Sequence, residues 1–183
     1  MRVSFYAALF LITGCAAAPE KLESVARKES VRMAAPSRPF SSFVGYELKA
    51  MSFGSIQQDQ AKLERARELD TKLRAKLEPL LNQWNSAPKS GAKTGRLVIE
   101  PQLADLRIVS GGARFWAGAF AGGSNVDLDL SITDGDSGQL IAKPRVALQA
   151  GGMAGGWSIG KSDSNLLDYI ASVSYQYLED HYR

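Results

Sequence analysis

The sequence is poor in the residues from which disulfide and metal sites are built. Its 183 residues include one cysteine and one histidine, His181. One cysteine excludes an intramolecular disulfide and a multi-thiolate metal site, and one histidine excludes a histidine-rich metal cage. An excess of one charge is lacking as well, since the sequence has 22 Lys and Arg residues and 19 Asp and Glu residues, a formal net charge of +3. This balance does not indicate a nucleic-acid partner.

Long apolar runs are also lacking, although 45% of the residues are apolar, which is ordinary for a globular protein. The first apolar run, Val3–Ile12, follows the basic Met1-Arg2 and is shorter than the roughly 18 residues that a membrane span needs. No later run reaches that length either. A short basic start followed by a short apolar run is typical of an export signal.

The residues Ile12-Thr13-Gly14-Cys15, directly after this run, resemble the lipobox of bacterial lipoproteins. The resemblance implies cleavage between Gly14 and Cys15, acylation of the Cys15 thiol and acylation of the new amine. Ala16, rather than Asp, follows the cysteine, which by the same resemblance implies sorting to the outer membrane, facing the periplasm of a Gram-negative cell. The alternative is a plain secretory signal that contains a cysteine.

We therefore divide the chain into a signal peptide over 1–14, a lipidated cysteine with a flexible tether over 15–39, and one domain over 40–183. The tether is expected because residues 16–39 show no clean period and contain three prolines. A short amphipathic helix over Leu22–Met33 is the alternative interpretation of that segment.

Hydrophobic periodicity predicts six elements in the domain. Four are strands and two are helices, in the order β-α-β-β-β-α: a strand over 44–50, a helix over 59–84 that Pro79 kinks or ends early, strands over 96–109, 125–133 and 139–150, and a helix over 163–180. A phase slip predicts a bulge near Ala104-Asp105, and Pro144 places the last strand at an edge. The expected fold is α+β, a four-stranded mostly antiparallel sheet with two helices on one face.

The hairpin between the last two strands has a predicted register. The turn Asp134-Gly-Asp-Ser-Gly138 joins them. Pairing about this turn sets Asp129 opposite Lys143 and Asp127 opposite Arg145 on the outer face. Opposite charges across strands favour this arrangement over a catalytic carboxylate pair. The turn also lacks the later ligands of a calcium loop.

The domain resembles a family of small bacterial lipoproteins that carry a domain of unknown function. The resemblance rests on the glycine-and-aromatic stretch Ser110–Gly123, the strand that ends in Asp134, the Gly138 turn, and a glycine-rich run before the terminal helix. It covers roughly residues 40–180. It implies the fold and the export route and brings no catalytic residues.

Strand order brings both glycine-rich segments and both helix N-termini to one end of the sheet, and helix N-termini favour anions. This end is the candidate binding surface. Its candidate residues are Arg114, Phe115, Trp116, Phe120, Trp157, Gly160, Lys161 and Ser162. Glycines four apart in these segments indicate either a contact loop for a partner or tight turns.

Gly155–Ser162 also fits the phosphate-binding pattern G-x-x-x-x-G-K-[ST]. Only 21 residues follow Ser162, which is too few for the parallel units that complete a nucleotide site. An anion- or nucleotide-binding protein using this loop is the alternative function.

The one histidine, His181, lies near the end of the sequence, so we expect no serine to have a histidine beside it. The sequence therefore shows no set of residues arranged for nucleophilic catalysis. We expect a lipid-anchored envelope lipoprotein that acts as a binding or assembly component, without catalytic activity, cofactor or metal. The expected partners are the membrane, through the lipid anchor, and an envelope protein or a second copy of the chain. No nucleic acid is expected.

Overall fold

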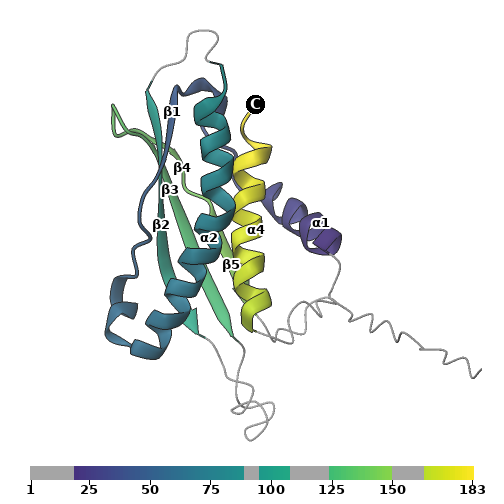
Figure 1. Ribbon diagram of the computed structural model, residues 1–183, viewed down its shortest axis with the longest axis vertical. Helices are drawn as coiled ribbons and strands as arrows, with labels where there is room; N and C mark the ends of the chain where they lie inside the picture. Colours follow the sequence, from purple (N-terminus) through teal and green to yellow (C-terminus); the bar gives the residue numbers. More distant parts are fainter. Residues whose placement is uncertain (1–18, 89–94, 108–123, 150–162) are drawn as a thin grey trace, which may run out of the picture.

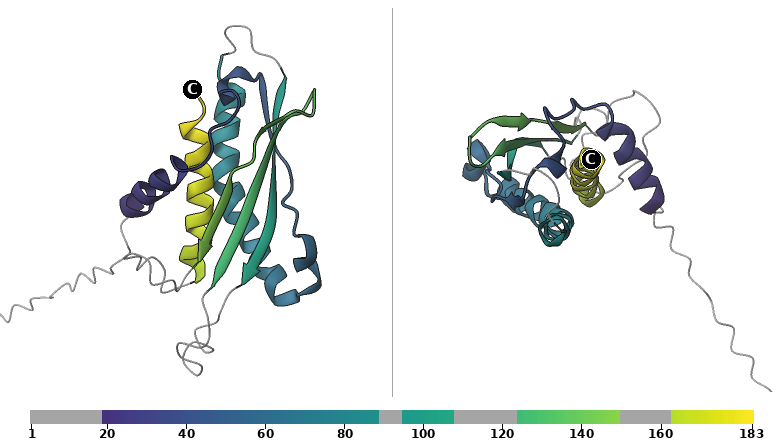
Figure 2. Two further views of the ribbon diagram at one scale, coloured as in Figure 1. Left: turned by 180° about the vertical axis from the view of Figure 1, so that it is seen from behind. Right: turned by 90° about the horizontal axis from the view of Figure 1, so that it is seen from above.

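The computed structural model describes residues 19–88, 95–107, 124–149 and 163–183. These residues form a mixed five-stranded sheet and three α-helices, two of which pack against the same face of the sheet (Figures 1 and 2). The α+β class is confirmed. The expected four strands and mostly antiparallel sheet are wrong in detail, because one strand is parallel to its neighbour and another is broken in two.

The parallel pair is at the first edge of the sheet. β1 (Gly45–Leu48) runs parallel to β2 (Arg96–Arg107), because the long helix α2 (Gln60–Ser86) carries the chain back to the end where β1 began. β3 (Asn125–Asp134) is antiparallel to β2. The register between β2 and β3 shifts between Leu103 and Asp105, so the predicted bulge is confirmed.

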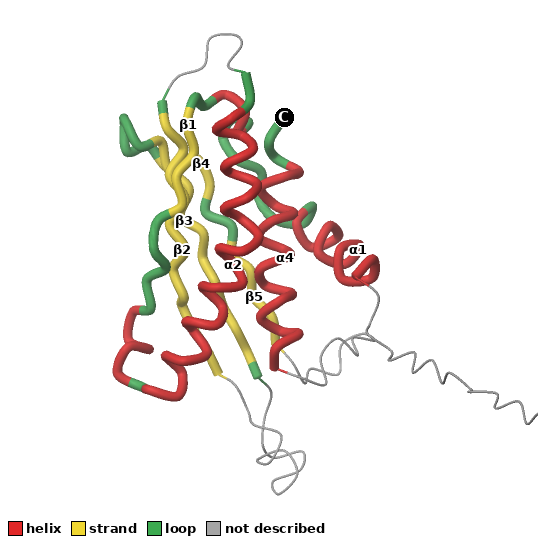
Figure 3. Tube along the Cα trace, viewed as in Figure 1, coloured by secondary structure: helices red, strands yellow, loops and turns green. Residues whose placement is uncertain are grey.

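The predicted strand over 139–150 is two strands, β4 (Leu140–Ala142) and β5 (Arg145–Gln149), which both pair with β3 (Figure 3). The break falls at Pro144, which has no N–H to donate and contributes its carbonyl oxygen to the N–H of Leu130 at 3.0 Å. Leu140 is 52% exposed, because the register between β3 and β4 shifts beside it and sets it opposite Thr133.

α2 begins where the sequence predicts and ends later. The side chain of Asp59 caps it by accepting a hydrogen bond from the Lys62 N–H at 3.2 Å. The helix continues past Pro79 to Ser86, so of the two effects expected of Pro79, a kink or an early end, the early end does not occur. Pro79 is on the exposed side, where water can bind the carbonyl of Ala75 that loses its helical donor.

α4 (Asp163–Asp180) has the predicted bounds and is central to the fold. It contacts β3 and β5 on one side, α2 on another, and a third helix, α1 (Pro19–Ser30), on its outer side. Most of its described residues are therefore buried, polar ones such as Ser174 included.

α1 corrects the interpretation of residues 15–39 as a flexible tether. Over Pro19–Ser30 the chain is helical, so the alternative of a short helix is confirmed with bounds three residues earlier than the expected Leu22–Met33. Ala26 of this helix is buried against the domain. The chain after α1 is bonded to the domain as well: the carbonyl of Ala34 accepts from the Tyr177 hydroxyl at 2.9 Å, and the Ser37 N–H donates to the Ile141 carbonyl at 2.9 Å. None of the helices in the described ranges has the length and apolar character to cross a bilayer.

Candidate functional site

The described residues that flank the two glycine-rich segments lie at one end of the sheet. Arg107, at the end of β2, pairs with Asn125 of β3, and Asn125 also pairs with Gln149 of β5. α4 begins at Asp163 at this same end (Figure 1). The Asn125 side chain donates to Asp105 at 2.7 Å and ties the bulged end of β2 to β3. The flanks of the two segments thus converge as strand order predicts.

The residues of the predicted surface lie beyond these flanks, outside the described residues. They fall in 108–123 and 150–162: Arg114, Phe115, Trp116, Phe120, Trp157, Gly160, Lys161 and Ser162. Gly14 and Cys15 precede the first described residue, Pro19. The predicted surface and the predicted lipidation site therefore remain predictions.

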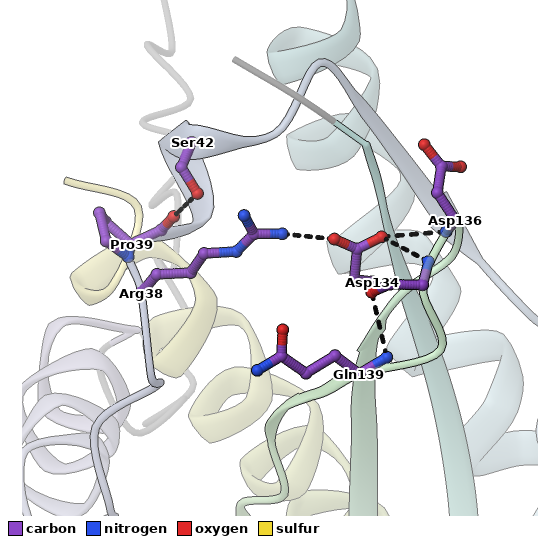
Figure 4. Close-up of polar contacts among 7 residues, drawn as sticks. Arg38, Pro39, Ser42, Asp134, Asp136 and Gln139 are labelled. Atoms are coloured by element: carbon purple, nitrogen blue, oxygen red, sulfur yellow. Dashed lines mark hydrogen bonds and ion pairs between the residues drawn. The ribbon is translucent and has the colours of Figure 1, made fainter. Parts of the chain in front are cut away.

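At the opposite end of the sheet, the largely buried carboxylate of Asp134 accepts hydrogen bonds from three groups (Figure 4). Oδ1 of Asp134 accepts hydrogen bonds from the N–H groups of Asp136 at 2.9 Å and Ser137 at 3.2 Å, which confirms the predicted turn. Oδ2 accepts from Nη2 of Arg38 at 2.5 Å. The two backbone donors, and after them the Arg38 charge, hold the pKa of Asp134 below its usual range.

This carboxylate has little room for a further ligand. Gly95 faces it with a φ of +73°, and a Cβ at that position would lie 3.1 Å from Oδ1 of Asp134. The Arg38 guanidinium also lies over the ring of Phe43, 4.0 Å from its centroid. The cluster therefore fastens the segment that follows α1 to the β3–β4 turn.

The face of the sheet away from the helices carries a bidentate ion pair. Nε of Arg145 donates to Oδ1 of Asp129 at 2.6 Å, and Nη2 donates to Oδ2 at 2.9 Å. The predicted register is wrong by two residues, since Asp129 faces Arg145 and Asp127 faces Ala147. A shift of two keeps every side chain on its face, so the expected pairing of opposite charges persists with a different partner for Asp129.

These two carboxylates predict acid-sensitive stability. The Arg145 hydrogen bond lowers the pKa of Asp129, as the turn lowers that of Asp134. Each carboxylate stabilises the folded state fully above the ordinary aspartate pKa of about 3.9. This stabilisation is lost as the pH falls through the lower pKa of the folded state, because the carboxyl group binds its proton at a higher pH in the unfolded chain than in the folded one. Thermal melting between pH 7 and pH 2.5 should show this fall, and Asp129→Asn should flatten it. Asp136→Asn, at an exposed side chain, is the control; an equal flattening there would contradict the assignment.

The one histidine of the sequence belongs to an aromatic cluster. Nδ1 of His181 lies 2.9 Å from the carbonyl oxygen of Tyr177, and the two ring centroids are 4.4 Å apart. Phe40 contacts both rings. Among the described residues, no serine hydroxyl is bonded to this histidine, and no three His, Cys, Asp or Glu side chains gather closely enough to hold a metal ion.

The described residues form one further feature that the sequence did not predict, a polar groove of about 640 Å³ over the outer side of α4. α1 supplies one wall, Lys76 of α2 contributes to the other, and α4 supplies the floor. The lining residues are Glu23, Ser24, Ala26, Arg27, Lys76, Ser172, Tyr175, Gln176 and Glu179. We call this feature the α1–α4 groove.

The sequence held a partial signal for this groove. Ala26 and Ser30 are small residues four apart within Leu22–Met33, which is the spacing of a helix face that packs closely on another helix. The spacing does not say which helix is the partner. Recognising the groove requires knowing that α1 packs on α4, and only the tertiary structure gives that.

The domain is thus a two-layer α+β unit with a mixed sheet, to which an N-terminal helix is added. No family model and no curated protein matches the chain. Among solved structures, it is similar to a PelC dodecamer from Paraburkholderia phytofirmans, with 12% identity and a TM-score of 0.48. A single-substitution variant of that dodecamer gives 13% identity and a TM-score of 0.44. Each match covers 80% of this chain and 95% of the other chain. At TM-scores below 0.5, neither similarity assigns a function or an oligomeric state to this chain.

Proposed function

We propose that this chain is a lipid-anchored envelope lipoprotein that acts as a binding or assembly component and performs no catalysis. The observation that carries the proposal is the position of α1. Its first residue, Pro19, is four residues after the lipobox cysteine, and its buried face packs against α4. An anchor at Cys15 would therefore hold the whole domain close to the membrane.

The arrangement of the sheet supports a binding role. The flanks of two glycine-rich segments meet at one end, and those segments contain Phe115, Trp116 and Trp157. Aromatic side chains of this kind dominate the energetics of protein interfaces. We propose that this end contacts an envelope protein or a second copy of the chain, at the periplasmic side of the outer membrane in a Gram-negative cell.

Fractionation and crosslinking of expressing cells test this function. The wild-type chain should sediment with membranes and carry the mass of a cleaved, acylated Cys15, because several acyl chains anchor a protein stably. Cys15→Ser should leave the membrane fraction or stay unprocessed. Ala16→Asp should still be acylated but should be retained at the inner membrane instead of being sorted to the outer membrane. Crosslinking on membranes should give a product larger than the monomer, reduced by Trp157→Ala.

Two outcomes would count against the proposal. If the Cys15→Ser chain were cleaved as before and still found in the membrane fraction, the proposed lipid anchor would be wrong. Recovery of the crosslinked monomer alone would remove the assembly role.

One observation favours the alternative of anion or nucleotide binding. α4 begins at Asp163, and Gly160-Lys161-Ser162 immediately precede it in the sequence, as a phosphate-binding pattern precedes a helix. Lys161→Ala should abolish anion binding in the alternative and leave membrane crosslinking unchanged in the main proposal. Calorimetric titration with inorganic phosphate distinguishes the two.

A further inference from the structure

The α1–α4 groove has a fixed wall. Ala26 of α1 is 1% exposed and Ser30 is fully buried. The hydroxyl of Ser30 donates to Oδ2 of Asp180 in α4 at 2.5 Å, which locks the end of α1 onto that helix. The groove therefore belongs to the folded domain and does not depend on a loose N-terminal segment.

The groove presents charges of both signs. Arg27 on the α1 side and Lys76 on the α2 side are exposed cations, and neither forms an ion pair within the described part of the chain. Glu23 and Glu179 are exposed carboxylates along the same groove.

The floor of the groove is polar rather than apolar. Ser172 and Gln176, one turn apart on α4, are each 5% exposed and line it. Their donors are bonded within α4: the Ser172 hydroxyl donates to the Asp168 carbonyl at 2.8 Å, and Nε2 of Gln176 donates to Asp180 at 2.7 Å and to Glu179 at 3.2 Å. The charged side chains along the groove are therefore the groups that select a ligand, and a ligand that matches them carries one negative and one positive charge.

The groove is also within reach of a lipid surface. The four residues from Cys15 to Pro19 span at most about 14 Å, and the eight residues from Pro19 to Arg27 advance about 12 Å along a helix. An acyl anchor at Cys15 thus keeps the α1 wall within about 26 Å of the membrane. This step rests on the lipid anchor proposed above.

We propose that the α1–α4 groove binds the headgroup of a phosphatidylethanolamine from the membrane that holds the anchor. Arg27 and Lys76 bind the phosphate by charge-assisted hydrogen bonds, and Glu23 and Glu179 accept hydrogen bonds from the ammonium group. Phosphatidylcholine has the same net charge, but its quaternary amine has no N–H to donate. The groove therefore selects phosphatidylethanolamine over phosphatidylcholine, and over the purely anionic phosphatidylglycerol.

Native mass spectrometry of the full processed protein, released from detergent micelles with added dihexanoyl lipids, tests the proposal. One dihexanoyl phosphatidylethanolamine per chain should remain bound, with at least tenfold weaker retention of the phosphatidylcholine and phosphatidylglycerol analogues. The double variant Arg27→Gln/Lys76→Gln should lose about tenfold in retention, as expected when a charged partner of a phosphate is removed. Glu23→Gln should lose the preference for ethanolamine over choline.

Lys28→Gln is the matched control, since Lys28 is an exposed cation of α1 that does not line the groove. Equal retention of all three lipids, tightest retention of phosphatidylglycerol, or an equal loss in Lys28→Gln would each overturn the proposal. Free phosphoethanolamine that binds as tightly as the lipid would also overturn it, by assigning the groove to a soluble ligand. The same spectra report the mass at Cys15, so failure of the anchor is seen separately from failure of the groove.

Discussion

Replacing Phe40 by alanine is expected to lower the free energy of unfolding by about 3–5 kcal/mol. Phe40 is fully buried in the segment that follows α1, and its ring contacts those of Tyr177 and His181 at centroid distances of 6.2 and 6.4 Å. Its backbone is fixed as well, because its N–H donates to the His181 carbonyl at 3.0 Å and its own carbonyl accepts from the Tyr46 hydroxyl at 3.0 Å. Because these hydrogen bonds fix the backbone, the cavity that the smaller alanine side chain would leave cannot close by a simple backbone shift.

Denaturant unfolding of the purified protein, followed by tryptophan fluorescence, measures this loss. Val44→Ala, at a side chain that is 41% exposed a few residues away, should change the free energy of unfolding by no more than about 0.5 kcal/mol. If Phe40→Ala lost less than about 1 kcal/mol, this segment would contribute little to the stability of the domain, contrary to its burial.

Local patterns of the sequence were sufficient for most helices and strands. The alternation along β3 and the three-and-four spacing along α2 report which face of each element is buried, so their existence and facing follow from the period. The bulge was predictable too, because the slip in parity between Leu103 and Leu106 has few other causes.

The errors arise where the outcome depends on a partner far away in the sequence. Parity fixes the face of Asp129 but not whether Lys143 or Arg145 lies opposite, so the register could be wrong by two without any local sign. Whether Pro79 ends α2 depends on packing at both sides of it: Leu77 and Leu80 are buried against the domain, and that burial outweighs one lost hydrogen bond.

The candidate site shows the same limit more strongly. The convergence of the glycine-rich segments follows from strand order, which the sequence predicts. The α1–α4 groove joins residues more than 140 positions apart, such as Arg27 and Gln176, and neither side chain has an unusual sequence context. Only the packing of Ala26 and Ser30 on α4 brings them together.

Replacing Ala26 by glutamate is expected to release α1 from α4 while the rest of the domain stays folded. Ala26 is 1% exposed, so a glutamate there has no space and no water, and an unpaired buried carboxylate costs several kcal/mol. A twelve-residue helix cannot offset that cost and is marginal in water once detached. Hydrogen exchange should show loss of protection over Pro19–Ser30, and limited proteolysis should cut this segment at least tenfold faster than in the wild type.

The same variant separates the fold of the domain from the position of its anchor. Because α1 joins the core at its edge, through Ala26 and its packing on α4, the sheet, α2 and α4 should keep their exchange protection. Ala26→Ser, which adds one small polar atom, should behave nearly as the wild type does. Cooperative unfolding of the entire domain by Ala26→Glu would show instead that the rest of the core does not stay folded without α1. If only α1 detaches, Arg27 is no longer held opposite Lys76, so the retained phosphatidylethanolamine should be lost while acylation of Cys15 is unchanged. That pattern would place headgroup binding in the docked helix and membrane attachment in the lipid.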